Sequence, residues 1–322
     1  MKPKLLLTGR TGQVGSELFH LLPAFGEVVA PGRNELDLLD TNSIRRAVRQ
    51  IRPEVIINAA AYTAVDAAEN QKAEVYAINT VAPAVFAEEA KKIGAAIVHY
   101  STDYVFDGLK REPYEETDLP NPMNEYGKTK LAGDQAIHAS GVPYLIFRTA
   151  WVYASRGRNF LRTILRLATE REEIRVVQDQ FGAPTWSREI AESTVRILGQ
   201  LPSDSGAASA ISQVSGIYHL SAEGVTTWHE FACAILEEAR HITGDVPWFR
   251  EATNGQPLVA RRVIPISTAE YPTRALRPPY SVLSNALMKR TFGFALSDWR
   301  LELHAVFGAE RGAPASPRPS ER

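Results

Sequence analysis

The amino-acid sequence predicts an α/β protein with a doubly wound parallel sheet, followed by a smaller α/β part toward the C-terminus. Short continuous apolar runs, typical of strands covered on both faces, alternate with longer amphipathic stretches typical of helices. A three-glycine array lies where the first apolar run meets the first helical stretch. The hydrophobic fraction of 44% over 322 residues is enough to bury a sizeable core.

The first 150 residues alternate regularly between strand and helix patterns. The strands are expected at 4–8, 27–30, 54–60, 95–101 and 143–149. The helices are expected between them, at 12–23, 41–52, 72–93 and 125–140. This alternation predicts a parallel sheet with helices on both faces, formed by residues 1–150. A sixth strand at 174–177 and a helix at 187–200 are expected to return to this first domain.

The character of the chain changes after residue 150, and residues 151–307 are expected to form mainly the second, smaller part. The small and polar stretch 203–216 predicts a mobile loop. The elements expected after it are a strand at 217–221, a helix at about 226–240, a proline-rich irregular stretch at 257–283 and a last helix ending near 307. Residues 308–322 have nothing to bury and predict a disordered tail.

Composition excludes several classes of protein. The net charge of −1 argues against a nucleic-acid binder that neutralises phosphates. The single cysteine, Cys233, excludes an intramolecular disulfide and a cysteine-rich metal site, and favours a reduced, cytoplasmic setting. No apolar stretch approaches the roughly 20 residues that span a bilayer, and the short run at the N-terminus lacks the features of a signal peptide.

The glycine array "LLLTGRTGQVGSEL" predicts a dinucleotide site. Gly9, Gly12 and Gly15 follow a strand and open a helix. The first glycine permits a tight turn, the second lets backbone approach a pyrophosphate, and the third allows close helix–sheet packing. The helix N-terminus then offers free N–H groups to the phosphates. A glycine turn without a ligand is the alternative, but strand, spacing and helix together favour a Rossmann-type cofactor site.

The end of the second strand indicates which nicotinamide cofactor is used. An acidic residue there would bind the ribose of NAD, whereas an arginine accommodates the 2′-phosphate of NADP. The sequence places Gly32 and Arg33 at this point, which favours NADPH, and Glu35 nearby leaves NADH open. Asp37 and Leu38 follow and are expected to contact the adenine, with a turn or helix-capping role as the alternative for Asp37.

Three further features lie at the carboxyl ends of predicted strands, where open α/β sheets bind ligands. Small residues, Ala59 to Ala61, end the third strand and leave room for a cofactor, although close packing under a helix would need the same residues. Ser101, Thr102 and Asp103 end the fourth strand. Tyr126 and Lys130 then share one face of the next helix, while Lys128 points elsewhere.

Tyr126 and Lys130 could be an acid–base pair or simply part of a solvated helix face. A neighbouring ammonium is expected to lower the pKa of the phenol from about 10, so that Tyr126 can exchange a proton near neutrality. Lys130 can also bind the nicotinamide ribose, and Thr102 can donate to the substrate oxygen. The glycine array, the Ser/Thr after the fourth strand and YxxxK on the next helix together resemble the extended short-chain dehydrogenase/reductase superfamily.

Longer strings resemble one family within it. "NAAAYTAVDAAE", "HYSTDYVFDG", "YGKTKLAGD", "FRTAWVY", "DQFGAPT" and "RPPYSVLSN" look like the dTDP-4-dehydrorhamnose reductase family, from about residue 3 to about 300. The resemblance implies reduction of the C4 keto group of dTDP-4-dehydro-β-L-rhamnose to dTDP-β-L-rhamnose with NADPH or NADH. That reaction supplies a precursor for cell-surface polysaccharide. A monomer or a homodimer remains open.

The resemblance also implies roles for particular residues. Tyr126 would be the proton donor, with Lys130 as its partner and Thr102 at the reacting oxygen. The residues expected to line the cofactor, beyond the glycines and Arg33, are Gln13, Val14, Asp37, Leu38, Ala59, Ala61, Tyr62, Thr63, Tyr100, Tyr126 and Lys130. The residues expected at the sugar nucleotide are Thr102, Asp103, Tyr126, Trp151, Arg277 and Ser281. A core position for Trp151 and a structural turn for the last two are the alternatives.

Departures from the family pattern concern a metal ion. Some members bind magnesium through glutamates at a dimer interface, and Glu17 and Glu189 lie at comparable positions. Arg300 stands where a carboxylate is expected and disfavours a cation, so no metal ligand is assigned and Mg²⁺ stays an open alternative. Glu302 is expected to be a solvated acid on a helix face rather than a substitute ligand.

Two other functions compete with a reductase. A sugar-nucleotide dehydratase would carry a glutamate after the Thr-Asp pair, where this chain has Tyr104. An epimerase belongs to the same group of rivals. A non-catalytic protein similar to the regulatory subunit of methionine adenosyltransferase is the second rival, against which the combination of Thr102, Tyr126 and Lys130 argues.

Overall fold

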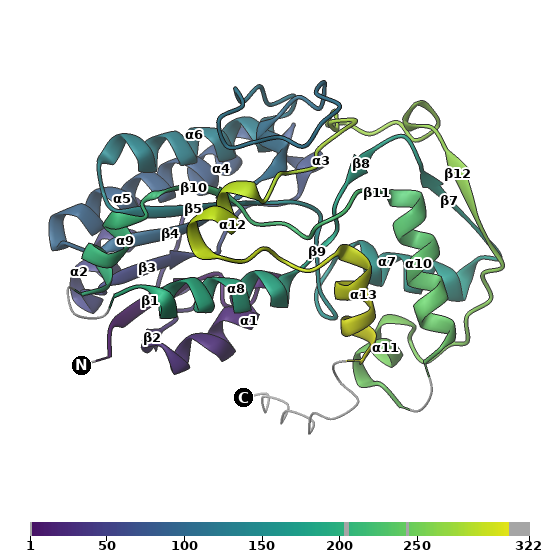
Figure 1. The fold of residues 1–322 in the computed structure, drawn as a ribbon, viewed down its shortest axis with the longest axis horizontal. Coiled ribbons are helices and arrows are strands. Elements are labelled where there is room, and N and C mark those ends of the chain that lie inside the picture. The colour runs from purple at the N-terminus through teal and green to yellow at the C-terminus, as the bar shows by residue number, and fades with distance from the viewer. Residues whose placement is uncertain (1, 203–205, 243–244, 309–322) are drawn as a thin grey trace.

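A six-stranded parallel sheet forms the centre of the larger part of the molecule (Figure 1). The computed structural model describes residues 2–202, 206–242 and 245–308. The strand order is β10-β5-β4-β3-β1-β2. The strands are β1 (Lys4–Thr8), β2 (Glu27–Val29), β3 (Val55–Asn58), β4 (Ala96–Thr102), β5 (Tyr144–Thr149) and β10 (Gly216–His219). The order reverses between β1 and β3, and the carboxyl ends at such a switch point form the usual ligand crevice.

Helices cover both faces of the sheet, as the alternation of strand and helix patterns predicts. Leu5 and Leu7 of β1 pack on one face, against helices α1, α8, α9 and α12. Leu6 packs on the other face, against α2, α5 and α6. The bounds of these helices are α1 (Gln13–Leu21), α2 (Thr41–Ile51), α5 (Ala82–Ile93), α6 (Glu125–Ser140), α8 (Ser187–Gln200), α9 (Ala207–Gln213) and α12 (Ala286–Phe292). The doubly wound α/β class is therefore confirmed.

The helix expected at 72–93 forms in three connected pieces. α4 (Lys72–Tyr76) continues through a π-helical turn at Ala77–Val81 into α5. Such turns insert one extra residue into a helix and are frequent at functional sites. Here the turn brings Asn79, which is 1% exposed, against the loop that follows β3. The short helix α3 (Val65–Ala68) lies in that loop.

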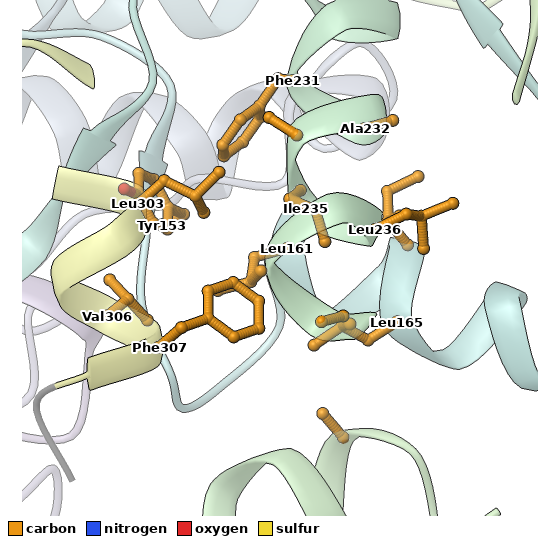
Figure 2. Close-up of a cluster of buried hydrophobic side chains, with 14 of the residues drawn as sticks. Tyr153, Leu161, Leu165, Phe231, Ala232, Ile235, Leu236, Leu303, Val306 and Phe307 are labelled. Carbon is orange, nitrogen blue, oxygen red and sulfur yellow. The ribbon is translucent and has the colours of Figure 1, made fainter. Parts of the chain in front are cut away.

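The smaller part has its own apolar core, to which α7, α10 and α13 contribute (Figure 2). Phe231 and Leu236 of α10 meet Leu161 of α7 and Leu303 of α13 there. The elements of this part are β6 (Val152–Tyr153), α7 (Phe160–Glu170), β7 (Glu173–Val177), β8 (Phe181–Gly182), β9 (Thr185–Trp186), β11 (Thr226–Thr227), α10 (Trp228–Arg240), α11 (Pro247–Ala252), β12 (Arg262–Ile266) and α13 (Trp299–Gly308). Figure 1 shows this part beside one end of the large sheet.

Three expectations about local structure are wrong. The strand at 174–177 forms as β7, but it pairs with β12 rather than joining the large sheet, whose sixth strand is β10. Helix α9 forms within the stretch expected to be a loop, although 203–205 lie outside the described residues. The proline-rich stretch contains β12, because Val263 and Ile264 find a partner strand that is distant in sequence. The expected tail lies outside the described residues from 309 onward.

Within the described parts of the chain, no helix is long and apolar enough to cross a bilayer.

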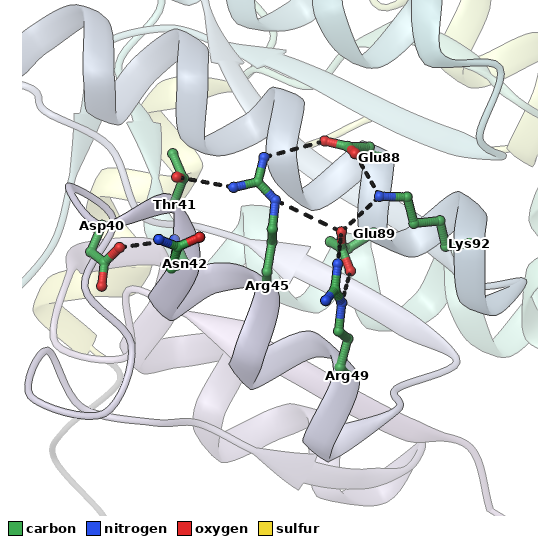
Figure 3. Close-up of polar contacts among 8 residues, drawn as sticks. All are labelled: Asp40, Thr41, Asn42, Arg45, Arg49, Glu88, Glu89 and Lys92. Atoms are coloured by element: carbon green, nitrogen blue, oxygen red, sulfur yellow. Dashed lines mark hydrogen bonds and ion pairs between the residues drawn. The ribbon is translucent and has the colours of Figure 1, made fainter.

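A charged cluster joins α2 to α5 on the surface of the larger part (Figure 3). The Glu89 carboxylate is inaccessible to solvent and accepts from Arg49 Nε at 2.6 Å and Nη2 at 2.9 Å. Lys92 Nζ donates to the same carboxylate at 3.0 Å. Hydrogen bonds from Arg49, which outweigh the burial, lower the pKa of Glu89 from 4.5 to about 2.

The Glu89→Gln substitution is expected to lower the free energy of unfolding by about 1–2 kcal/mol near neutral pH. The reason is that Arg45, Arg49 and Lys92 lose their shared carboxylate, although the exposure of Arg49 and Lys92 limits the loss. The pKa of Glu89 in the folded protein lies below its value in the unfolded chain. The stabilisation is therefore present above about pH 4.5 and disappears as the pH falls through 4.5 toward about 2. Denaturant unfolding of both proteins at several pH values measures this difference.

The control is Glu88→Gln, which removes a neighbouring carboxylate that is half exposed. We expect a smaller effect at neutral pH. A stability difference for Glu89→Gln that stays constant between pH 7 and 2.5 would contradict the assignment.

Candidate active site

The glycine loop after β1 has the shape that a pyrophosphate needs. Gly9 has φ +72°, and a Cβ on it would lie 2.7 Å from the Ala60 nitrogen. A Cβ on Gly15 would lie 2.0 Å from the Gly9 carbonyl oxygen, so no other residue fits without moving the loop. Gly12 donates its N–H to that oxygen at 2.8 Å and precedes α1 without a side-chain cap. The helix N-terminus therefore keeps N–H groups for an anion, and this cradle fits a dinucleotide.

Two arginines lie at the edge of this loop. Arg33 is exposed after β2, as the sequence predicts for a residue that meets a 2′-phosphate. Arg10 was not expected to take part, but its Nη2 lies 3.8 Å from the position of a Cβ on Gly32, next to Arg33. Its position directly after the first glycine of the array was the available signal. Glu35 accepts from the Gly32 N–H at 2.8 Å, so its carboxylate has a backbone partner.

Asp37 and Leu38 follow in a turn before α2. Asp37 Oδ1 accepts from the Leu39 N–H at 3.0 Å, which is the turn role named as the alternative. Its own N–H donates to Ser43 Oγ at 3.1 Å. Leu38 is partly buried against the core on the α2 side of the sheet. The adenine contacts of both residues stay predictions.

The loop after β3, residues 59–63, is held by Asn79. The Tyr62 N–H donates to Asn79 Oδ1 at 2.9 Å, and Asn79 Nδ2 donates to the Tyr62 carbonyl at 3.0 Å. Ala59 and Ala61 are partly exposed, and Thr63 is exposed. Asn79 was missed in the sequence because only the π-helical turn, which the sequence pattern does not reveal, orients its side chain toward this loop.

The remaining cofactor candidates lie on both sides of the glycine loop. Gln13 donates to the Val152 carbonyl at 3.4 Å, and its buried Oε1 has no hydrogen-bond partner among the described residues. Val14 packs against the core. The Tyr100 side chain also lies in the core, where its hydroxyl is 2.8 Å from Thr194 Oγ1. Only the backbone of Tyr100 therefore faces the site.

Thr102 and Tyr126 are brought together by β4 and α6. Asn124 caps α6 by accepting from the Gly127 N–H at 2.8 Å. A Cβ on Gly127 would lie 2.1 Å from the Tyr104 carbonyl oxygen, so this glycine lets the helix approach the end of β4 closely. The Thr102 hydroxyl is hydrogen-bonded to the Tyr126 side chain. It also contacts Asp103 Oδ1 at 3.0 Å.

The pKa of Tyr126 differs from the expectation, and that of Lys130 is also displaced from its usual value. Burial raises the pKa of Tyr126, and the hydrogen bond from Thr102 opposes this only in part. The expectation that Lys130 lowers that pKa is wrong for this structure, because the Lys130 Nζ donates elsewhere: to the Tyr100 carbonyl at 2.5 Å, with His99 Nε2 at 3.0 Å. Burial lowers the pKa of Lys130 to about 8. Lys128 is exposed and pairs with Glu125 at 3.0 Å, away from the site as expected.

The proline-rich segment brings two predicted substrate residues to the same region. Ser281 is buried, and its hydroxyl lies against the Asp103 carboxyl. Burial raises the pKa of Asp103 to about 7. Arg277 pairs with Asp66, with Nη2 to Oδ2 at 2.6 Å and Nη1 to Oδ1 at 3.2 Å. Arg277 therefore has a protein partner, yet its charge remains close to Tyr104.

Trp151 adopts an unusual backbone conformation at the start of the smaller part. Its φ is +47°, in a region that bulky residues seldom occupy. Its indole stacks on Trp228, with ring centroids 3.5 Å apart and an angle of 6°. A Cβ on Gly182 would lie 2.4 Å from Trp151 Cε2, so that residue must be glycine. Trp228 lies in the helix expected at about 226–240, and its contact with Trp151 was not predicted because the two residues are distant along the chain.

The acidic residues considered for a metal ion are Glu17, Glu189 and Glu302, and the charge of Glu189 acts on Glu302. Glu17 pairs with Arg156 at 3.7 Å. The expectation that Glu302 is solvated is wrong: it is 1% exposed and accepts from the Trp186 N–H at 2.7 Å, because α13 packs against β9. Burial raises the pKa of Glu189. The described residues contain no group of three or more His, Cys, Asp or Glu side chains that could hold a metal.

Comparison with known proteins agrees with this geometry. A family model described as the RmlD substrate binding domain matches residues 2–311. The dTDP-4-dehydrorhamnose reductase of Burkholderia thailandensis is 48% identical over 297 residues, covering 92% of this chain and 95% of the relative. The chain belongs to the dTDP-4-dehydrorhamnose reductase family. The member of that family from Escherichia coli K12 is 40% identical, covering 92% of this chain and 94% of the relative.

Solved structures of the dTDP-4-dehydrorhamnose reductase family have the same architecture. One from Bacillus anthracis, in complex with NADP, aligns with a TM-score of 0.83 at 33% identity, covering 96% of this chain and 100% of that chain. One from Clostridium acetobutylicum aligns with a TM-score of 0.82 at 34% identity, covering 95% of this chain and 99% of that chain. A UDP-glucose 4-epimerase from Thermus thermophilus, at 19% identity and a TM-score of 0.73, shares the fold alone.

Proposed function

We propose that this protein reduces the C4 keto group of dTDP-4-dehydro-β-L-rhamnose with NADPH, giving dTDP-β-L-rhamnose. The observation that carries the proposal is the hydrogen bond between Thr102 and Tyr126 at the carboxyl end of β4, with Lys130 donating to the Tyr100 carbonyl of the same strand. The sheet that carries Thr102 also carries, after β1, a glycine cradle for a dinucleotide. The chain is similar over nearly all its length to relatives named for this reaction.

The cofactor site fits NADPH, which when bound supplies the hydride. The α1 N-terminus and the three glycines would bind the pyrophosphate. Arg10 and Arg33 would pair with the 2′-phosphate, because both are exposed next to Gly32. The absence of an acidic residue at the end of β2 removes the usual contact to an unmodified ribose, although use of NADH stays open.

Tyr126 is the proton donor in this proposal. Burial keeps its phenol protonated at neutral pH, so a proton is available when negative charge develops on the C4 oxygen. Thr102 donates a second hydrogen bond to that oxygen. The Lys130 ammonium, which donates to the Tyr100 carbonyl and His99, would use its remaining donor on the nicotinamide ribose, and its charge would stabilise the phenolate that forms. Both roles need Lys130 charged.

The substrate would lie between the end of β4 and the smaller part. Asp103 and Ser281 would bind sugar hydroxyls, because both are polar and buried beside Thr102. Trp228 covers one face of Trp151, so the deoxysugar would contact the part of this indole that remains exposed. Arg277 would face the nucleotide with its charge shared with Asp66.

Two features favour the reductase over its rivals. A keto reduction needs a hydride, a proton donor and a partner for the oxygen, and Tyr104 stands where the dehydratases have a glutamate. A regulatory protein would not need the Thr102–Tyr126 hydrogen bond or a buried Lys130 that donates to the Tyr100 carbonyl. We also propose that the protein acts in the cytoplasm, as a monomer or homodimer, without a nucleic-acid partner.

The direct test is the oxidation of NADPH by the purified protein with dTDP-4-dehydro-β-L-rhamnose, followed by absorbance. We expect turnover that depends on the sugar, with dTDP-β-L-rhamnose as the product identified by chromatography. The UDP-linked keto-sugar in a parallel assay measures how much the nucleotide contributes. Binding of NADPH without turnover of either sugar would favour the regulatory alternative.

A further inference from the structure

A histidine lies directly beside Lys130 and takes no part in the chemistry described above. His99 lies in β4 and is inaccessible to solvent. Its Nε2 is 3.0 Å from Lys130 Nζ. Its other ring nitrogen, Nδ1, is 3.0 Å from the Asn58 side-chain amide. A buried imidazole with a neighbour at each nitrogen is well placed to orient the lysine.

The register of the sheet places three polar residues in one row beneath α6. Thr8 of β1 pairs with Asn58 of β3, and Asn58 pairs with His99 of β4. The other end of the Asn58 amide lies 2.7 Å from Thr8 Oγ1. Thr8 Oγ1 also accepts from the Ala60 N–H at 3.3 Å, at the start of the loop expected to line the cofactor. The row therefore connects the glycine-loop strand to Lys130.

The donors and acceptors around His99 determine which of its ring nitrogens carries the hydrogen. A neutral imidazole has one donor and one acceptor, whereas an ammonium has donors only. Nε2 must therefore accept from Lys130, and Nδ1 must donate. The structure places Asn58 Nδ2 against His99 Nδ1, with Asn58 Oδ1 accepting from the Thr8 hydroxyl. The assignment therefore requires the Asn58 amide to be turned over, so that its oxygen accepts from Nδ1 and its nitrogen donates to Thr8 Oγ1. The two orientations of an amide occupy the same space.

We propose that His99 is a positioning residue that holds the Lys130 ammonium through Nε2, in a tautomer set by Asn58 and Thr8. The proposal rests on the proposed reductase function, since Lys130 is there the partner of Tyr126. With the Tyr100 carbonyl and His99 as acceptors, two of the three Lys130 donors are engaged. One donor is left for the ribose or the phenolate.

The charged and titratable groups around His99 support a neutral ring and a charged lysine. Burial and the nearby Lys130 lower the pKa of His99 well below 6.5. Asp134 of α6 lies 3.9 Å from His99 Nε2 and raises the pKa of Lys130, against the larger effect of burial. Arg148 of β5 pairs with Asp134 at 3.6 Å. The phenols of Tyr100 and Tyr126, which are protonated at neutral pH, complete the set.

Two substitutions of His99 separate a positioning role from a packing role. Glutamine can still present an acceptor to Lys130, whereas asparagine is one methylene too short and reaches only the Asn58 side. We expect His99→Asn to lower kcat by about 10-fold with little change in KM for the sugar, and His99→Gln to restore most of it. The alkaline limb of the kcat profile should move about one pH unit lower in His99→Asn, because the ammonium loses an acceptor.

The control is His138→Gln. His138 lies on the exposed side of α6, the helix that carries Lys130, and its ring contacts the Tyr144 hydroxyl at 2.8 Å. It is expected to leave kcat and the pH profile unchanged. Thermal unfolding and NADPH binding of each variant show whether folding is intact. Equal kcat values and pH profiles for wild type and His99→Asn would overturn the proposal, whereas absence of turnover by the wild type would overturn the proposed function instead.

A measurement that needs no turnover tests the tautomer itself. NMR of the protein labelled with ¹⁵N-histidine should show, among the signals of the seven histidines, a neutral Nδ1–H ring that is lost in His99→Gln. Its Nε2 resonance should shift in Lys130→Met. An Nε2–H tautomer would mean that Lys130 is neutral and accepts from His99, and would overturn the proposal. A ring protonated at neutral pH would do so as well.

Discussion

Replacing Tyr126 with phenylalanine is expected to lower kcat by about 10²- to 10⁴-fold while NADPH still binds. The substitution removes only the hydroxyl, which is hydrogen-bonded to Thr102 and, in the proposed reaction, donates the proton to the C4 oxygen. Steady-state kinetics with the keto-sugar measure the loss, and fluorescence titration measures the affinity for NADPH. Because the ring remains, its edge-on contact with Tyr104, at a centroid distance of 6.0 Å, is kept.

Two other tyrosines make this test specific. Tyr144→Phe removes a half-buried hydroxyl that contacts His138 and is expected to leave kcat unchanged. Tyr104→Phe removes the hydroxyl of the neighbouring, partly buried ring. If Tyr104→Phe lost as much activity as Tyr126→Phe, or if Tyr126→Phe kept the full rate, Tyr126 would not be the sole proton donor.

The Gly15→Ala substitution is expected to weaken NADPH binding at least about 10-fold. A Cβ there would lie 2.0 Å from the Gly9 carbonyl oxygen, which is part of the backbone and cannot rotate away. Helix α1 must therefore move from the loop, and its N–H groups leave the place where they would meet the pyrophosphate. Titration with NADPH measures the change in Kd, and the sugar can be omitted.

The control is Gly199→Ala near the end of α8, where no atom lies within 4 Å of a new Cβ. Alanine is the better helix former, so we expect unchanged Kd and equal or slightly higher stability. Wild-type affinity for NADPH in Gly15→Ala would show that the loop does not bind the pyrophosphate as proposed.

Local patterns predicted the elements of the first domain well. The strands at 4–8 and 143–149 and the helix at 125–140 form within one or two residues of the expected bounds, because continuous apolar runs and helical periodicity report burial directly. The three glycines were also predictable, since Gly12 and Gly15 approach the Gly9 carbonyl oxygen within the array and Gly9 itself has a positive φ. Tyr126 and Lys130 share a helix face by spacing alone.

Predictions failed where the partner of a segment is distant in sequence. The strand at 174–177 has the composition of a strand of the large sheet, but its pairing partner is β12, about 90 residues later in the chain. Glu302 follows a helical pattern that predicts exposure, yet α13 packs so that the Trp186 N–H needs its carboxylate. Trp151 and Trp228 stack although 76 residues separate them. No local pattern specifies these contacts.

The sequence by itself determined the fold class, the dinucleotide loop and the identity of the residues proposed to be catalytic, because strand periodicity, glycine spacing and an i, i+4 pair are local properties. Only the tertiary structure decided the ionisation of those residues. Burial raises the pKa of Tyr126 and lowers that of Lys130, which reverses the expectation for the tyrosine. It also decided that Lys130 meets His99, because the register of three parallel strands beneath α6 brings Thr8, Asn58 and His99 into one row.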